Sequence, residues 1–265
     1  MERTACDPVV PALLPRSCQV WWARTDDVRP EHDDLLDEAD LARRARLLRA
    51  GDRQRTTVAW AVARLVLGAH LGRAPDRLRI DRTCAACGAA HGKPRLLDAQ
   101  ELHFSLSHSA DLVAVAVSRA GPVGVDIEQV APWVDADLDE VADLTLARVE
   151  RAVLARQPAG DRALAFTTYW TRKEAAVKAV GTGLTTPLED IVVSAPSAPP
   201  RLLRWGSDGQ RVPLLYPLRA TPGTVGTLAV LDGAPVHVVE RDAAELLAVA
   251  HTSRRLSAAT TRSQR

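Results

Sequence analysis

The chain has 265 residues, a length that suits one large domain or two small ones. Its hydrophobic share of 46% and charged share of 25% are those of a folded globular protein, and they exclude disorder along the whole chain and collagen-like repeats. The net charge of +1 provides no global field that attracts a polyanion, so we do not expect general nucleic-acid binding.

Strands and helices follow one another in two similar series. In chain order we expect a strand at Cys18–Ala23, a helix at Asp34–Arg49, a helix that Asp52 caps and that runs through Ala69, a loop at Asp81–Pro94, strands at Leu102–Leu106, Leu112–Ser118 and Val123–Glu128, helices at Leu138–Arg156 and Ala163–Val180, and strands at Asp190–Val193, Pro213–Leu218, Thr224–Leu231 and Pro235–Val239. Gly181 would end the last helix as a C-cap. This order predicts an α+β fold of two comparable halves, 1–120 and 121–251, and a disordered polar tail at 252–265.

The N-terminal apolar stretch Val9–Leu14 holds a proline, Pro11, and is too short to cross a bilayer or to act as a signal sequence. Four cysteines do not make a disulfide framework in a chain of this length. We therefore expect a cytoplasmic protein with no membrane contact.

Lysine is rare in this chain. Of its 34 basic residues only Lys93, Lys173 and Lys178 are lysine. Where arginine is used everywhere else, a lysine indicates a position that needs a compact ammonium group, although chance would give the same pattern. The segment Arg43–Arg55 carries six arginines and one aspartate, which fits an anion site or a solvated helix face.

Two carboxylates alternate along the predicted strand at Val123–Glu128. Asp126 and Glu128 point to the same face, with Cα atoms about 6.6 Å apart, so both could bind one cation. Two like charges beside buried residues are costly unless a positive group lies between them. A strand that faces solvent is the alternative, and for an isolated D-x-E it is the more common case.

Trp170, Glu174 and Lys178 are spaced four residues apart and lie along one stripe of the predicted helix. Taken alone, Glu174 and Lys178 are typical of a surface pair that stabilises a helix. The rarity of lysine favours a functional stripe instead.

Two further segments carry polar groups suited to anions. In HFSLSHS, Ser107 and His108 end a strand beside a turn, which favours a small anion-binding nest; a Ser-His-Asp triad with Asp111 lacks the nucleophile elbow of hydrolases. In HGKPRLL, Gly92 permits close backbone approach, and Lys93 and Pro94 suit a loop along a phosphorylated ligand, with a simple turn as the alternative.

A C-x-x-C pair, Cys84 and Cys87, comes just before that loop, with His91 four residues further on. These residues make half of a zinc site. No second C-x-x-C follows, and Cys6 and Cys18 are irregularly placed, so reduced loop cysteines are favoured over zinc.

The order G-K-P, F-S-L-S-H-S, V-G-V-D-I-E and W-T-R-K-E-A-A-V-K with a trailing G-T-G-L resembles the 4′-phosphopantetheinyl transferases of the larger, Sfp-type class. The resemblance is dense from Gly92 to Leu184. Two features depart from it: the C-x-x-C loop is absent from the best-known members, and Ala175–Val177 is smaller than the stretch with an aromatic residue that some members carry. Neither departure affects a proposed ligand.

The resemblance implies a fold of two pseudo-twofold-related halves with the active site between them. It also implies residue roles: Mg²⁺ carboxylates at Asp126, Glu128 and Glu174, a lysine beside the pyrophosphate at Lys178, and coenzyme A contacts at Gly92, Lys93, Pro94, Ser107, His108, Asp126, Arg55 and, on looser spacing, Arg43. Glu174 is our candidate for the base and Lys178 for the charge-neutralising group.

The implied reaction moves 4′-phosphopantetheine from coenzyme A to a serine of an apo acyl or peptidyl carrier protein, with Mg²⁺, and releases 3′,5′-ADP. The carrier could belong to fatty-acid, polyketide or nonribosomal-peptide biosynthesis, and two halves in one chain predict a monomer. The alternatives are another Mg²⁺-dependent nucleotide phosphotransferase and a zinc-containing binding module.

Overall fold

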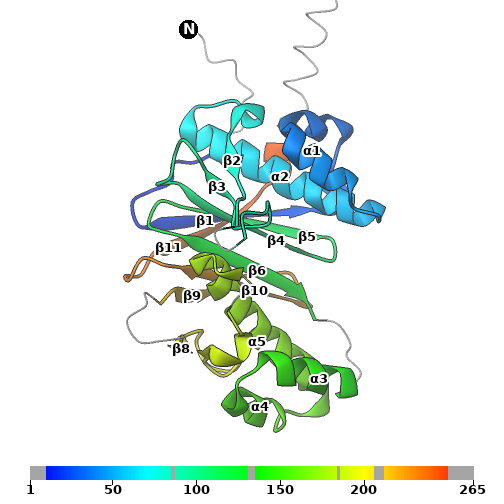
Figure 1. The fold of residues 1–265 in the computed structure, drawn as a ribbon, viewed down its shortest axis with the longest axis vertical. Coiled ribbons are helices and arrows are strands. Elements are labelled where there is room, and N and C mark those ends of the chain that lie inside the picture. Colours follow the sequence, from blue (N-terminus) through cyan, green and yellow to red (C-terminus); the bar gives the residue numbers. More distant parts are fainter. Residues whose placement is uncertain (1–9, 85–86, 131–134, 184–185, 206–211, 250–265) are drawn as a thin grey trace, which may run out of the picture.

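The computed structural model describes residues 10–84, 87–130, 135–183, 186–205 and 212–249 (Figure 1). Cys6, Leu184 and the tail predicted to be disordered, 252–265, lie outside these ranges. Within them, no helix combines the length and the apolar character needed to cross a membrane.

Two stacked sheets form the centre of the molecule, and the long helices cover their outer faces (Figure 1). The helices are α1 (Glu38–Ala45), α2 (Ala50–Leu71), α3 (Asp135–Thr145), α4 (Arg148–Leu154) and α5 (Ala159–Val180). The strands are β1 (Ser17–Arg24), β2 (Ile80–Asp81), β3 (Arg95–Leu96), β4 (His103–Ser109), β5 (Leu112–Ser118), β6 (Val123–Gln129), β7 (Val192–Val193), β8 (Leu202–Arg204), β9 (Leu214–Pro217), β10 (Thr224–Val230) and β11 (His237–Asp242).

The first sheet has the strand order β11-β1-β5-β4, and the second has the order β6-β10-β9. β5 runs antiparallel to β1 and β4, whereas β11 returns from the end of the chain to pair in parallel with β1. The turn around Ala120 joins β5 to β6 and so passes from the first sheet to the second. All residues of β5 are buried, because α2 packs on one side of this sheet and the second sheet on the other.

Three apolar clusters separate the layers. The first lies between α2 and the first sheet and includes Val62 and Phe104; the second, with Val20 and Ile127, fills the space between the sheets. The third packs α5 and α3 against the second sheet. The layer order α, β, β, α confirms the expected mixed α+β fold.

Most predicted strands are confirmed, and the helix at Ala163–Val180 is confirmed with its C-cap, since Gly181 has a φ of 86°. Three helix predictions are wrong in detail. The helix expected at Asp34–Arg49 is a 3₁₀ turn at Pro30–Leu35 followed by α1, and that expected at Leu138–Arg156 is divided into α3 and α4. Asp52 does not cap α2, which begins at Ala50; it lies in the first turn and pairs with Arg55.

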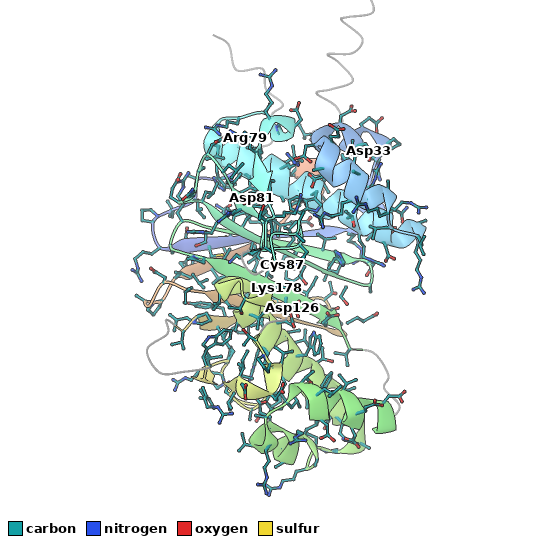
Figure 2. The ribbon with its side chains drawn as sticks, in the orientation of Figure 1. Asp33, Arg79, Asp81, Cys87, Asp126 and Lys178 are labelled. Carbon is teal, nitrogen blue, oxygen red and sulfur yellow. The ribbon has the colours of Figure 1, made fainter. Side chains whose placement is uncertain are left out.

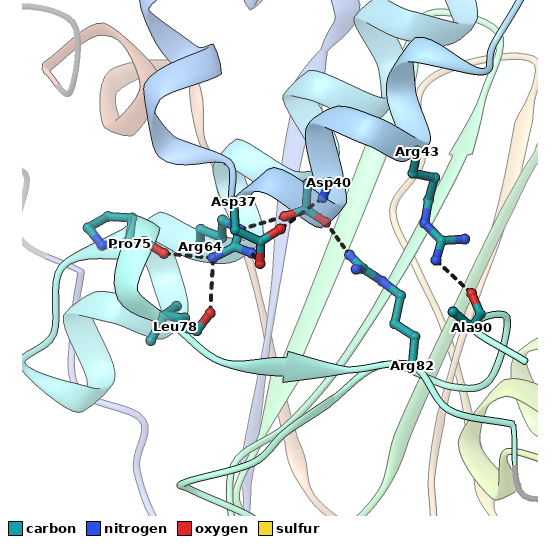
Figure 3. Close-up of polar contacts among 8 residues, drawn as sticks. All are labelled: Asp37, Asp40, Arg43, Arg64, Pro75, Leu78, Arg82 and Ala90. Atoms are coloured by element: carbon teal, nitrogen blue, oxygen red, sulfur yellow. Dashed lines mark hydrogen bonds and ion pairs between the residues drawn. The ribbon is translucent and has the colours of Figure 1, made fainter. Parts of the chain in front are cut away.

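A buried ion-pair network joins α1, α2 and the segment after β2 (Figure 3). Arg64 of α2 is fully buried, pairs with Asp37 and Asp40 of the α1 region, and donates to the carbonyl of Pro75 at 2.9 Å. Arg82 reaches the other oxygen of Asp40. Each buried charge therefore has a partner, which is the condition for charges to remain inside a protein.

Candidate active site

The strand β6 presents Asp126 and Glu128 on one face, as predicted from their spacing. Its other face, with Val123, Val125 and Ile127, is fully buried between the sheets. Asp126 is only 3% exposed, so its charge needs a partner. The solvent-facing alternative for this D-x-E is therefore wrong for Asp126.

The partner is Lys178 of α5. Its Nζ donates to Oδ1 of Asp126 at 2.6 Å, to the carbonyl of Val125 at 3.2 Å and to Oγ of Ser107 at 3.3 Å. Figure 2 shows Lys178 and Asp126 next to each other where α5 meets β6. The surface-pair interpretation of this lysine is wrong, because its ammonium contacts a buried carboxylate on another element.

A glycine in β6 brings the helix this close. A methyl group at Gly124 would lie 2.9 Å from the carbonyl carbon of Lys178 and closer still to the backbone of Ala175 and Ala179. The backbone of α5 thus rests directly on that of β6. The small residues Ala175 and Ala179, both fully buried, complete this contact. The sequence interpretation missed Gly124, although a glycine inside a strand signals a close backbone approach.

Three serines of β4 connect the two sheets. The hydroxyls of Ser105, Ser107 and Ser109 accept hydrogen bonds from the backbone N–H groups of Val125, Ile127 and Gln129, at 3.1, 3.2 and 2.9 Å. Hydroxyls thus replace the carbonyls that a further strand would offer to the free edge of β6.

The same serines orient the carboxylates of β6. Ser107 donates to Oδ1 of Asp126 at 3.1 Å, and Ser109 donates to Oε2 of Glu128 at 2.8 Å. The predicted anion nest is therefore occupied at Ser107 by a carboxylate of the protein itself. Asp111 pairs with Arg24, which leaves no support for a triad with His108.

These groups line one cavity of about 380 Å³ between α2, β4, β6 and α5. Its walls include Trp170 of the α5 stripe and Trp60 of α2. They also bring together six of the predicted site residues: Ser107, His108, Asp126, Glu128, Glu174 and Lys178. The guanidinium of Arg82 stacks 3.8 Å above the ring of Trp60 and holds it in place.

The cavity holds more negative than positive charge. Burial raises the pKa of Asp126, and the neighbouring Lys178 opposes part of that rise. Burial, followed by the charge of Asp126, raises the pKa of Glu128 and of Glu174. A bound cation would stabilise the ionised forms of these three carboxylates, which are costly when all three are charged at once.

The donor set fits a hard divalent cation. Oδ2 of Asp126, a residue that lines the cavity, is buried and has no hydrogen-bond partner, so its lone pairs lack a donor group. Carboxylate oxygens are the ligands that Mg²⁺ prefers. In the structure, oxygens of Asp126, Glu128 and Glu174 do not all lie within 4.8 Å of one another; Asp126 contacts Lys178, and Glu128 contacts Ser109.

The other predicted coenzyme A residues lie outside this cavity. Gly92, Lys93 and Pro94 line a second cavity, where Nζ of Lys93 donates to the carbonyls of Val123 at 3.0 Å and Ala179 at 2.7 Å. Lys93 binds the carbonyl of Val123 and Lys178 binds that of Val125, two residues further along β6. The two cavities are therefore neighbours along the free edge of β6.

The two predicted phosphate arginines line neither cavity. Arg55 donates to the carbonyl of Ala110 at 2.8 Å, and Arg43 donates to that of Ala90 at 2.6 Å (Figure 3). Arg55 lies near His108, whose pKa is lowered by burial and then by this positive charge among others. Arg55 is thus beside the first cavity, and Arg43 is beside the loop that precedes Lys93.

The three lysines share one kind of contact, which is an ammonium bound to backbone carbonyls. Lys173 donates to the carbonyls of Thr145 at 2.8 Å and Leu188 at 2.9 Å, and pairs with buried Glu150 at 2.5 Å. It lines neither cavity. The rarity of lysine thus indicates positions where a compact ammonium is needed, of which only two are near the candidate site.

Comparison with known proteins agrees with this geometry. Residues 122–218, which include β6 and α5, match the 4′-phosphopantetheinyl transferase superfamily. The 4′-phosphopantetheinyl transferase HetI of Nostoc sp. is 32% identical over 197 residues, covering 72% of this chain and 79% of that protein. The transferase psf-1 of Bacillus pumilus is 34% identical over 140 residues, 53% of each chain, and Sfp of Bacillus subtilis is 32% identical over 103 residues, 39% of this chain and 44% of its own.

Together with the carboxylate cavity between β6 and α5, these similarities show that the chain belongs to the 4′-phosphopantetheinyl transferase superfamily.

Proposed function

We propose that the cavity between α2, β4, β6 and α5 is where this enzyme transfers 4′-phosphopantetheine from coenzyme A to the serine of an apo carrier protein. The single observation that carries the assignment is the buried, unpartnered Oδ2 of Asp126 beside the ammonium of Lys178. A carboxylate and an ammonium at one point suit a pyrophosphate that arrives with a cation.

Asp126, Glu128 and Glu174 are the residues that would hold Mg²⁺. When bound, Mg²⁺ supplies positive charge that neutralises the pyrophosphate oxygens. The raised pKa values of all three carboxyls support this role, because a bound cation would offset the cost of burying their charges and the repulsion that Asp126 exerts on Glu128 and Glu174.

Lys178 neutralises the departing 3′,5′-ADP. All three of its N–H donors have acceptors, and the contact with Ser107 at 3.3 Å is the longest of them. A phosphate oxygen would replace this contact while the ion pair with Asp126 remains. The ammonium is then held in position before the substrate arrives.

Glu174 accepts the proton of the carrier serine as its hydroxyl attacks the β-phosphate. Because bound Mg²⁺ would lower the pKa of a carboxylate ligand, Glu174 would take this proton through a water that it orients. The bond from the β-phosphorus to the leaving oxygen of 3′,5′-ADP breaks as the bond to the serine oxygen forms.

Gly92, Lys93, Pro94, His108, Arg55 and Arg43 are proposed to contact the remainder of coenzyme A. Lys93 of the second cavity and Lys178 of the first bind carbonyls two residues apart on β6, which supports one extended ligand reaching both. The proposed adenosine-side residues thus lie in 1–120, and the proposed carboxylate ligands in 121–251.

The two halves, 1–120 and 121–251, are proposed to be related by a pseudo-twofold axis. Each contributes a sheet and a long helix on that sheet, α2 and α5, both of 22 residues. β11 belongs by sequence to the second half but pairs with β1 of the first. This exchange ties the halves together and favours a monomer, which would act in the cytoplasm, where coenzyme A and apo carriers are made.

The test is incubation of the full chain with coenzyme A, Mg²⁺ and a panel of apo carriers from fatty-acid, polyketide and peptide synthesis. We expect one carrier class to gain the mass of one phosphopantetheine. The gain should disappear when Mg²⁺ is removed with a chelator. A folded enzyme that modifies none of the carriers would overturn the proposal.

A further inference from the structure

The loop between β2 and β3 brings two thiols and an imidazole together. Ligand atoms of Cys84, Cys87 and His91 all lie within 4.8 Å of one another, and Sγ of Cys87 lies 3.0 Å from Nε2 of His91. Cys84 and Cys87 form no disulfide. The active-site proposal uses none of these three residues.

The backbone of the loop folds around this cluster. The N–H of Cys84 donates to the carbonyl of Ala89, and that of Gly88 donates to the carbonyl of Cys84, both at 2.8 Å. Gly88 has a φ of 74°, so the chain reverses directly after Cys87 in a conformation that favours glycine.

Close packing fixes the far end of the loop. A methyl group at Gly92 would lie 2.6 Å from the carbonyl oxygen of Thr83 and 2.9 Å from Cα of Cys84. The N–H of Gly92 donates to the carbonyl of Arg82 at 2.7 Å. The two ends of the loop are therefore held side by side.

Apolar burial does not account for the compactness of this loop. Cys87 and His91 are exposed, as are the small residues between them. A short loop without buried apolar side chains gains little from the hydrophobic effect, and a bound metal is one of the devices that order such segments.

We propose that Cys84, Cys87 and His91 bind one zinc ion. Two thiolates and an imidazole form the soft to borderline donor set that zinc prefers, unlike the carboxylate oxygens of the active-site cavity. In a tetrahedral zinc site, the ligand atoms lie roughly 3.5–3.8 Å apart, a spacing that the cluster reaches with small side-chain rotations.

The fourth coordination position would belong to water or another small donor, since no further His, Cys, Asp or Glu in the described ranges joins the cluster. From sequence spacing alone, reduced cysteines were the favoured state. The convergence of His91 on Cys87 is the observation that reverses this preference.

The zinc ion would order the segment that leads to Lys93. Arg43 of α1 donates to the carbonyl of Ala90, and Lys93 anchors the next residues to β6 and α5. In Figure 2, Cys87, Lys178 and Asp126 follow one another down the middle of the molecule. The ion would thus stabilise a loop that contacts α1 in the first half and leads to Lys93, which contacts β6 and α5 in the second half.

The test measures metal in the full chain without reference to transfer activity, so its failure would leave the proposed function untouched. Wild-type protein purified without added zinc should hold about one zinc ion per chain by elemental mass spectrometry. After exchange into Co²⁺, it should show thiolate-to-cobalt charge-transfer absorption in the near ultraviolet.

Cys87→Ser and His91→Ala should lower zinc affinity at least about tenfold, because even residues behind the ligands contribute that much. Both side chains are exposed, so both variants should fold, as circular dichroism would verify. Cys18→Ala is the matched control and should keep the metal, since burial raises the pKa of the Cys18 thiol to about 12. Wild type without zinc or the cobalt band, a disulfide between Cys84 and Cys87, or unchanged metal binding in Cys87→Ser would overturn the proposal.

Discussion

Asp126 and Lys178 form the ion pair at the centre of the candidate site, and each depends on the other. The side chain of Lys178 is 31% exposed and that of Asp126 is 4% exposed. Removing one partner leaves the other charge poorly compensated, whereas removing both does not. This coupling separates a site residue from a surface lysine.

A double-mutant cycle tests this coupling. Lys178→Met should lower the free energy of unfolding because it leaves the buried carboxylate of Asp126 uncompensated, and adding Asp126→Asn should cancel part of that loss, with a coupling of about 1–3 kcal/mol. Denaturant unfolding of the four proteins measures it. Additive losses would return Lys178 to the class of surface residues.

Glu174 should show a conflict between stability and activity. Its raised pKa means that the native state binds a proton more tightly than the unfolded state, so the ionised carboxylate costs stability near neutral pH. That cost should be absent at pH values below the pKa of the unfolded chain, where both states are protonated, and complete at pH values above the native pKa.

Glu174→Gln removes this charge and keeps the shape of the side chain. We expect Tm at neutral pH to rise by about 1–3 °C and kcat to fall by roughly 10²–10⁴. Thermal denaturation and steady-state kinetics measure the two effects. Glu140→Gln, at an exposed position of α3, is the control and should change neither. Retained turnover in Glu174→Gln would remove this residue from the base assignment.

At the scale of elements, the contact between β6 and α5 decides where Lys178 lies. Gly124→Ala adds a methyl group that would overlap backbone atoms of α5. Backbone atoms cannot move aside as the end of a flexible side chain can. The helix must shift, so we expect a loss of about 1–3 kcal/mol of stability and of most turnover. Gly160→Ala in the same helix, where nothing lies within 4 Å, should be neutral or stabilising. Equal behaviour of the two variants would contradict the described packing.

The serines of β4 divide into two roles. Ser105→Ala leaves the N–H of Val125 without its acceptor and should cost about 1–3 kcal/mol while turnover stays near normal. Ser107→Ala should cost a similar amount and also lower kcat, because Ser107 contacts both Asp126 and Lys178. Chemical denaturation and kinetics of both variants test the division. It would be wrong if Ser107→Ala kept full turnover.

Sequence periodicity predicted the strands well but placed helix breaks poorly. The break before α1 follows from Asp37, whose side chain accepts the N–H of Asp40 at 2.8 Å and whose charge meets Arg64 of α2. The break before α4 follows from Glu150, which caps the N–H of Ala147 at 2.8 Å and pairs with Lys173. The two caps join residues close in sequence, whereas the ion pairs with Arg64 and Lys173 join residues distant in sequence, which a local pattern cannot reveal.

The candidate site was predictable to the extent that the periods of strands and helices fix the direction in which each side chain points. Asp126 and Glu128 on one strand face and Trp170, Glu174 and Lys178 on one helix stripe needed only the periods of the two elements. What the sequence did not reveal is how the elements meet. Trp60 enters from α2, which only the stacking of the two sheets brings near.

At the scale of the whole molecule, side-chain hydrogen bonds join the two stacked sheets along the edge of β6. Serine hydroxyls accept its N–H groups, while Lys93 and Lys178 take two of its carbonyls. Six of the predicted site residues gather in the cavity along this edge, whereas Arg43 and Arg55 lie outside it. The edge of β6, where the two halves meet, is therefore also the place where a pyrophosphate would contact charged groups from both halves.

The central claim is that the site at this edge transfers phosphopantetheine through the carboxylates of β6 and α5. The most direct measurement is the intact mass of an apo carrier after incubation with coenzyme A, Mg²⁺ and either wild-type enzyme or folded Asp126→Asn. The wild type should add one phosphopantetheine to the carrier, and Asp126→Asn should add none in the same time at saturating coenzyme A. Equal modification of the carrier by the two enzymes would contradict the claim.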